Sequence, residues 1–190
     1  ALPLADALLA GGLPVAEITF RTAAAAEVIA LLSKERPDLL VGAGTVLTRE
    51  NVDAARECGA QFAVAPGLNP DIVSRAAEVG LPFVPGVCTP GDIERALAMG
   101  CATLKFFPAG AMGGGAMLKA LSGPYAHTGV KFVPTGGVNT ENLESYLRLD
   151  AVAAVGGTWI AKRADLATGN WAEIEARCRS AVATVARCRE

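Results

Sequence analysis

Short runs of apolar and β-branched residues alternate along the chain with longer amphipathic or alanine-rich stretches. The short runs predict strands at residues 15–20, 39–45, 61–66, 82–87, 102–108, 131–136 and 151–157. The longer stretches predict helices at residues 2–10, 23–34, 49–58, 71–78, 91–99, 116–121, 141–149 and 171–187. Strands and helices that alternate at this spacing indicate βαβ units and a parallel sheet.

The order of these elements favours an α/β fold of the (β/α)₈ TIM-barrel type. The chain of 190 residues suits a single domain, residues 1–190, although such barrels typically need roughly 250 residues. It starts with a helical segment that no strand precedes, so we expect the barrel to lack its first strand in this chain. The alternative is a doubly wound open sheet, which tolerates seven strands. A barrel without one strand exposes two sheet edges, so we expect compensation such as oligomer contacts.

The first predicted strand carries charged residues on one face. Side chains alternate between the faces of a strand, which places Glu17, Thr19 and Arg21 together and puts apolar residues opposite them. In a parallel barrel both faces are covered, and the apolar face packs against the outer helices. The polar set must then point into the barrel, where charged groups need partners or a ligand.

Lys105 lies in the middle of an apolar strand, with Leu104 and Phe106 on the opposite face. Burial favours the neutral amine, which is the nucleophilic form. A purely structural ion pair between Lys105 and Glu17 is the alternative. The other lysines are weaker candidates, because they lie in predicted helices, at the start of a strand, or, as with Lys162, in a Lys-Arg pair that we expect on the surface.

Glycine-rich segments end several of the predicted strands. Thr135-Gly136-Gly137 and Gly156-Gly157-Thr158 follow two strands near the end of the chain, where barrel enzymes often bind phosphate. Glycines at these positions free backbone N–H groups to point at an anion. A third segment ends in Thr45, whose hydroxyl is free to bind a carboxylate or a carbonyl.

Composition and charge narrow the range of partners. Hydrophobic residues make up 52% of the chain, charged residues 19%, and the net charge is −2 with no basic stripe, so we expect no nucleic acid partner. No apolar run approaches the roughly 20 residues of a membrane span, so we expect no membrane partner.

The five cysteines show no C-x-x-C spacing and indicate reduced thiols in the cytoplasm. The chain has one histidine, His127, so we expect no cluster of histidines that could bind zinc. A magnesium ion bound by carboxylates stays an alternative, for which Glu17 is the evident inward carboxylate. We expect no cofactor.

Lysine amines attack carbonyl carbons and form Schiff bases, which ease cleavage of an adjacent C–C bond. Six segments in order together resemble the 2-keto-3-deoxy-6-phosphogluconate (KDPG) and 4-hydroxy-2-oxoglutarate aldolase family: Val15–Thr22, Val41–Val46, Ala65–Gly67, Leu104–Ala109, Pro134–Val138 and Gly156–Trp159. The resemblance implies a class I aldolase, a lyase that splits KDPG into pyruvate and glyceraldehyde 3-phosphate in the Entner–Doudoroff pathway, with 4-hydroxy-2-oxoglutarate as a further candidate substrate. It also implies a homotrimer.

The resemblance assigns roles to residues that match the family's motifs. It implies Lys105 as the Schiff-base lysine and Glu17 as the general acid and base. Substrate-binding residues would be Arg21 and Thr45 at the pyruvyl carboxylate, Pro66 and Phe107 at the wall of the site, and Thr135, Gly136, Gly137, Gly157 and Thr158 toward the phosphate. The chain departs from the family's common pattern at Gly110, where glutamate is frequent, and at Thr158, where serine is frequent.

Two other functions fit parts of this pattern. Another phosphate-binding barrel, such as an isomerase or a synthase, would use the same glycine loops without needing Lys105 inside the barrel. A truncated or engineered barrel that serves as a scaffold without activity is the second alternative, and the missing first strand motivates it.

Overall fold

The structure is a computed structural model that describes residues 1–189. Its strands are β1 Val15–Thr19, β2 Leu40–Gly44, β3 Phe62–Val64, β4 Phe83–Val84, β5 Gly86–Val87, β6 Thr103–Phe106 and β7 Lys131–Pro134. Its helices are α1 Leu2–Ala10, α2 Ala25–Glu35, α3 Arg49–Glu57, α4 Pro70–Glu78, α5 Pro90–Ala98, α6 Gly114–Ser122, α7 Leu143–Leu147, α8 Arg163–Thr168 and α9 Trp171–Arg189, with the 3₁₀ helix η1 Gly123–Thr128. None of the helices in this part of the chain has an apolar stretch long enough to cross a bilayer.

The strands form two parallel sheets, with the orders β1-β2-β3-β4 and β5-β6-β7. The expected strand at residues 82–87 is divided between them at Pro85, which has no N–H group to donate to a ladder. The carbonyl of Pro85 still accepts a hydrogen bond of 2.8 Å from the backbone N–H of Lys105. The break therefore leaves one half of the predicted strand, β4, in the first sheet and the other half, β5, in the second.

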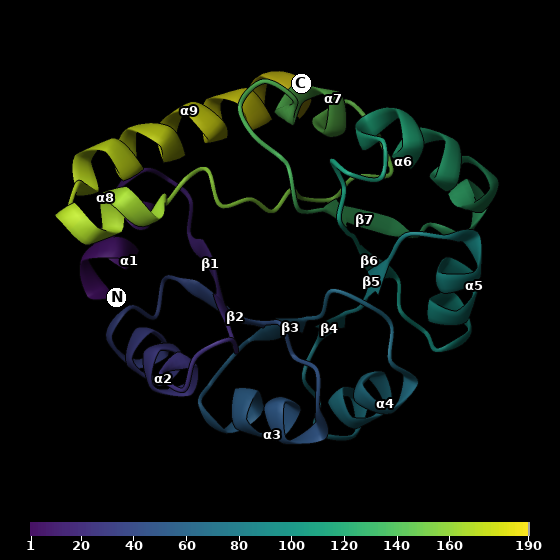
Figure 1. Cartoon of the computed structure of the whole chain (residues 1–190), viewed down its shortest axis with the longest axis horizontal. Coiled ribbons are helices and arrows are strands. Elements are labelled where there is room, and N and C mark those ends of the chain that lie inside the picture. Colours follow the sequence, from purple (N-terminus) through teal and green to yellow (C-terminus); the bar gives the residue numbers. More distant parts are fainter. Residues whose placement is uncertain (190) are drawn as a thin grey trace.

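The strands follow one another around a central region, and helices α2 to α6 lie outside them (Figure 1). The long helix α9 covers the side where α1 and the chain after β7 lie. This is the parallel α/β-barrel arrangement that the alternation of elements predicts.

The last expected strand, residues 151–157, does not form a regular strand, and this part of the prediction is wrong. It makes two isolated parallel bridges to the β7 side, Phe132 with Val152 and Thr135 with Gly156. Within residues 1–189 no strand pairing joins this segment to β1, so it has hydrogen-bonding partners on one side only. A segment paired along one edge and interrupted by glycines holds strand geometry weakly.

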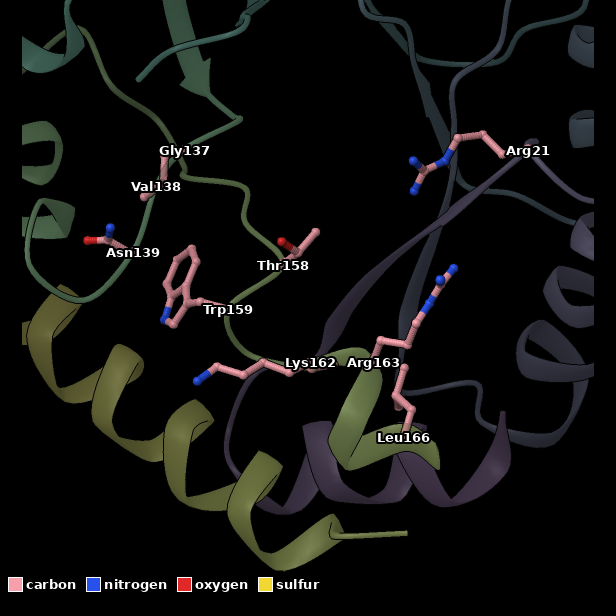
Figure 2. A pocket seen from close by; sticks show the side chains of 10 residues that line it. Arg21, Gly137, Val138, Asn139, Thr158, Trp159, Lys162, Arg163 and Leu166 are labelled. Atoms are coloured by element: carbon pink, nitrogen blue, oxygen red, sulfur yellow. The ribbon is translucent and has the colours of Figure 1, made fainter. Parts of the chain in front are cut away.

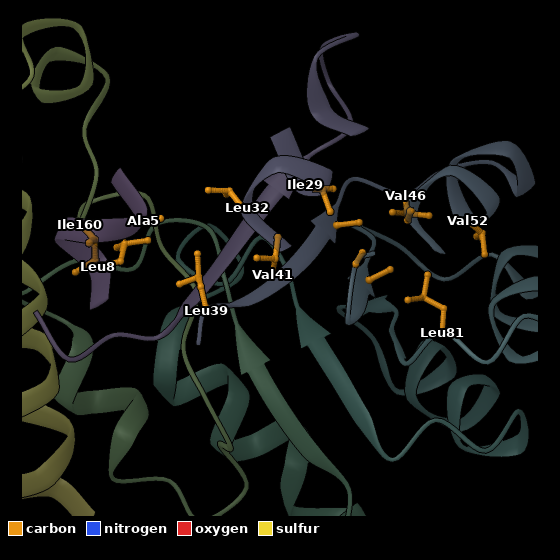
Figure 3. Packing of buried hydrophobic residues seen from close by; sticks show 14 of the residues in the cluster. Ala5, Leu8, Ile29, Leu32, Leu39, Val41, Val46, Val52, Leu81 and Ile160 are labelled. Carbon is orange, nitrogen blue, oxygen red and sulfur yellow. The ribbon is translucent and has the colours of Figure 1, made fainter. Parts of the chain in front are cut away.

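Apolar side chains from the outward faces of the strands pack under the helices. Leu104 and Phe106 on β6 are 0% exposed, and Ile18 on β1 packs against the cluster that Figure 3 shows around Val41 and Leu39. Burying one such side chain fully contributes roughly 1.5–3 kcal/mol. The predicted alternation on β1 and β6 is confirmed, and it leaves Glu17 and Lys105 on the inner face.

The helices begin and end near their predicted positions. Thr48 caps α3, since its hydroxyl accepts a hydrogen bond of 3.2 Å from the backbone N–H of Asn51. Thr89 and Asp92 form a capping box at the start of α5. The sequence pattern missed α8 and η1, whose six residues each are too few to display a helical period.

Candidate active site

A lysine and a glutamate meet on the inner face of the strands. The Nζ atom of Lys105 lies 3.5 Å from Oε1 of Glu17, with side chains 8% and 32% exposed respectively. The ring of Phe107 lies beside the amine, its centroid 5.6 Å from Nζ. The amine thus has one carboxylate and one aromatic face near it in a nearly closed environment. This arrangement suits an amine that attacks a carbonyl and a carboxylate that moves protons.

Backbone pairing fixes where these two side chains stand. In the ladder, Lys105 is the register partner of Gly86 on one side and of Val133 on the other. Glu17 is paired with Gly42, and its carboxylate lies over the next glycine of β2, Gly44. The glycine-rich end of β2 therefore makes room for the carboxylate to reach the lysine.

The loops after β6 and β7 pack closely through glycines. Gly136 has φ +88°, and a Cβ atom there would lie 3.0 Å from the Phe107 ring. The N–H of Gly110 donates to the carbonyl of Gly136 at 2.8 Å, and a Cβ on Gly110 would lie 3.2 Å from Cα of Gly137. Gly110, which departs from the family's common glutamate, thus lets the two loops approach closely.

A cavity of about 610 Å³ lies between Arg21, which follows β1, and the loops after β7 and before α8 (Figure 2). Three residues expected to bind substrate line it: Arg21, Gly137 and Thr158. Lys162 and Arg163 line it too, although we expected that pair to lie on the surface without a role in the site. Both side chains are exposed as expected, but they face a hollow that also holds predicted binding residues. Their position a few residues after Gly156-Gly157 was the signal that could have identified them.

Four further predicted binding residues do not line this cavity. Thr45 follows β2 with the unusual φ of +57°. Pro66 lines a second hollow of about 240 Å³. The hydroxyl of Thr135 donates to the carbonyl of Val133 at 3.3 Å. Gly157 lies against the Trp159 ring, where a Cβ atom would be 1.9 Å from the ring.

The amine and carboxylate inside a parallel α/β barrel define a class of protein, the barrel lyases that work through a lysine Schiff base. The model of the family "KDPG and KHG aldolase" matches residues 1–177. The chain is 50% identical over 173 residues to the 2-dehydro-3-deoxy-phosphogluconate aldolase of Haemophilus influenzae, covering 91% of this chain and 81% of that protein. It is 40% identical over 182 residues to the KHG/KDPG aldolase of Escherichia coli, covering 96% and 84%.

A solved structure agrees with these sequence matches. The KDPG aldolase of Legionella pneumophila, crystallised with pyruvate captured as a covalent carbinolamine, superimposes with a TM-score of 0.91 at 43% identity and covers 95% of this chain and 86% of that one. The chain belongs to the KDPG and KHG aldolase family. It is an aldehyde-lyase of the Schiff-base type.

Proposed function

We propose that this protein cleaves 2-keto-3-deoxy-6-phosphogluconate into pyruvate and glyceraldehyde 3-phosphate. The observation that carries the proposal is the buried Nζ of Lys105, 3.5 Å from the Glu17 carboxylate. The names of the Haemophilus and Legionella relatives support this substrate. Lys105 and Glu17 are the proposed catalytic residues.

In the proposed reaction, the neutral Lys105 amine attacks C2 of the substrate, and loss of water from the carbinolamine gives an iminium. Glu17 takes the proton of the C4 hydroxyl while the C3–C4 bond breaks, its electrons pass to the iminium, and glyceraldehyde 3-phosphate leaves. The enamine that remains takes a proton at C3, and hydrolysis of the resulting iminium releases pyruvate and the free amine. Every step uses groups of the substrate, water, Lys105 or Glu17.

The substrate lies, in this proposal, with its carboxylate toward Arg21 and Thr45 and its phosphate toward the glycine loops. The cavity that holds Arg21, Gly137 and Thr158 supports this orientation, because its cationic and hydroxyl groups suit a molecule with a carboxylate at one end and a phosphate at the other. We propose that the wall of the site is formed by Pro66 and Phe107, and the phosphate end by Thr135, Gly136, Gly137, Gly157 and Thr158.

A second substrate has its own support. The Escherichia coli relative is named a KHG/KDPG aldolase, so we propose that 4-hydroxy-2-oxoglutarate is also cleaved. Both substrates present the same 2-oxo acid end to Lys105 and give pyruvate. Parallel assays with both substrates, coupled to pyruvate detection, test this breadth.

The decisive experiment traps the Schiff base. The protein is incubated with pyruvate and reduced with borohydride, and the modified peptide is identified by mass spectrometry. A reduced pyruvyl adduct on Lys105, absent in Lys105→Ala, is the expected result. Lys131→Ala is the matched control, because that amine is bound to the carbonyl of Asp150 at 2.9 Å outside the site. An adduct elsewhere, or none, contradicts the proposed role of Lys105.

We also propose that the chain, as one domain spanning residues 1–190, forms a homotrimer in the cytoplasm. Exposed apolar side chains support an assembly: the register partners Val15 and Leu40 are 38% and 45% exposed, and Leu47 is 51% exposed. The five free cysteines support a reducing compartment. Light scattering on a size-exclusion column measures the mass of the assembly, and a monomeric mass contradicts the trimer.

A further inference from the structure

A phenylalanine stands in the same row as Glu17 on the inner face of the strands. Strands β1, β2 and β3 lie side by side (Figure 1), and Glu17, Gly42 and Phe62 are register partners across them. The partners one residue further on, Ala43 and Ala63, are fully buried in the apolar cluster under the helices. Because side chains alternate between the two faces of a strand, Phe62 points inward with Glu17.

The ring of Phe62 covers Gly42. A Cβ atom at Gly42 would lie 2.1 Å from Cζ and 2.3 Å from Cε2 of the ring, so the far end of the ring fills the space of the missing side chain. Phe62 is half-buried, and within residues 1–189 it is not among the apolar side chains that pack into the two clusters under the helices. The ring therefore contributes to the inner face of the strands and not to the packing outside them.

The two inward glycines of β2 are covered by different groups. Glu17 stands in the row of Gly42, yet its carboxyl group lies over Gly44. Two groups cannot fill one space, so the ring of Phe62 excludes the carboxyl group from the position over Gly42. A carboxyl group at that position would lie roughly 6–7 Å further back along the strand, because each residue rises about 3.3 Å. Proton transfer beside Lys105 requires hydrogen-bond reach of about 3 Å, which that shift would remove.

We infer that Phe62 is a positioning residue, whose ring holds the Glu17 carboxylate beside Lys105 by closing the alternative position over Gly42. The inference rests on the proposed function for the roles of Lys105 and Glu17. Phe62 has no group that takes up or releases a proton, so it acts through Glu17. Loss of the ring should impair proton transfer and leave the attack by the amine intact, because Lys105 stands on β6 and keeps the ring of Phe107 beside it.

Pyruvate alone allows the two steps to be measured separately. Borohydride trapping measures the adduct on Lys105. Proton transfer is measured in D₂O, where the Glu17 carboxylate removes a proton from the methyl group of the pyruvyl iminium and the electrons of that C–H bond pass to the iminium nitrogen, which gives the enamine. The carboxyl group exchanges its proton with the solvent and returns a deuteron to the same carbon. Proton NMR follows the loss of the methyl signal, with Lys105→Ala as the background. The measured quantity is the exchange rate divided by the amount of adduct.

Phe62→Ala should lower this ratio roughly tenfold, because a carboxylate that is in place for about a tenth of the time transfers protons at about a tenth of the rate. Phe62→Leu, which fills part of the space, should give an intermediate ratio. Phe83→Leu is the matched control. Phe83 is the register partner of Ala63, so it points to the outer face, where it packs against both apolar clusters. Its replacement should keep the ratio even where it lowers the stability of the protein.

A second substitution tests the exclusion directly. Gly42→Ala alone places a methyl group against the ring of Phe62, but combined with Phe62→Ala the same methyl group fills space that the ring has left. The double variant should therefore recover part of the lost ratio. An unchanged ratio in Phe62→Ala, an equal fall in Phe83→Leu, or a double variant as slow as Phe62→Ala overturns the inference. Failure of the proposed function is distinct, because it is seen as the absence of a pyruvate adduct on Lys105 in the unaltered protein.

Discussion

Oε1 of Glu17 fills the space that a side chain on Gly44 would need: a Cβ atom at Gly44 would lie 2.0 Å from that oxygen. The same oxygen lies 3.5 Å from Nζ of Lys105. The missing side chain at Gly44 therefore leaves room for the Glu17 carboxylate to lie next to the amine of Lys105. The position of the carboxylate depends on a residue that has no functional group of its own.

Replacing Gly44 with alanine should move the Glu17 carboxylate away from Lys105 and slow turnover. We expect a loss of about 10²-fold or more in kcat, because proton transfer requires hydrogen-bond reach. Steady-state cleavage assays measure it, and circular dichroism checks that the variant folds. Gly123→Ala is the matched control, since a Cβ atom there meets nothing within 4 Å. Turnover in Gly44→Ala equal to that of the control would contradict this coupling.

Glu17→Gln should leave Schiff-base formation possible while slowing carbon–carbon cleavage. The amide keeps the shape of the side chain but cannot take a proton, so we expect kcat to fall about 10²–10⁴-fold. Borohydride trapping with pyruvate reports the adduct, and single-turnover cleavage of the phosphorylated substrate reports the chemistry. Glu27→Gln, on α2 and away from the site, provides the control. Undiminished turnover in Glu17→Gln would remove Glu17 from the mechanism.

Lys105→Met separates a functional lysine from a structural ion pair. A buried ion pair contributes little net stability, and Glu17 is 32% exposed, so its carboxylate can be hydrated once the amine is gone. We expect Lys105→Met to unfold in urea within about 1 kcal/mol of the unaltered protein and to be inactive. Lys105→Ala, which also removes the packed stem, should be less stable than the methionine variant. A loss of about 3 kcal/mol or more in Lys105→Met would favour the structural alternative.

The inner face of the barrel was predictable from the sequence because strand periodicity is a local property. Alternation on β1 and β6 predicts that Glu17 and Lys105 lie inside, and the structure places their charged atoms 3.5 Å apart. The strand boundaries were less predictable. Pro85 divides one run between two sheets, and the segment 151–157 finds a ladder partner on one side only. The split at Pro85 and the missing strand at 151–157 both depend on which strands lie next to these segments in the folded protein.

The sequence did not predict that Lys162 and Arg163 line the cavity. A pair of cations after the last glycine segment is typical of a solvated surface, and both side chains are indeed exposed. Their contribution to the cavity comes from the turn that brings α8 opposite Arg21, about 140 residues earlier in the sequence. Local patterns carry no record of such a turn, and only the position of the pair a few residues after Gly156-Gly157 pointed toward the site.

Asp165 should make the stability of the protein depend on pH in the acidic range. Its hydrogen bond with Arg177 lowers its pKa in the folded state, so the unfolded state takes up the proton first as the pH falls. The stabilisation is complete above the ordinary aspartate pKa of about 3.9 and is lost as the pH falls from there toward the lower folded value. Urea unfolding of Asp165→Asn across this window should show a smaller decline than the unaltered protein. Asp38→Asn, an exposed carboxylate outside the ion pairs of residues 1–189, serves as the control, and an equal decline in all three proteins would contradict the prediction.

Thr45 has a strained backbone, which lowers the stability of the fold, and a hydroxyl that is proposed to bind the substrate carboxylate. It adopts φ +57°, a region that is strained for a β-branched side chain by about 1–2 kcal/mol. Thr45→Gly relieves this strain, and the greater freedom of glycine in the unfolded chain offsets roughly 0.4–1 kcal/mol of that gain. We therefore expect a variant at least as stable as the unaltered protein in urea, although it loses a half-buried side chain.

The same change removes the hydroxyl proposed to bind the pyruvyl carboxylate, so the pyruvate concentration needed for half-maximal adduct on Lys105 should rise about tenfold. Thr45→Ser keeps the hydroxyl and should bind pyruvate nearly as well; if glycine and serine bind pyruvate equally, Thr45 holds its strained conformation for a reason other than carboxylate binding.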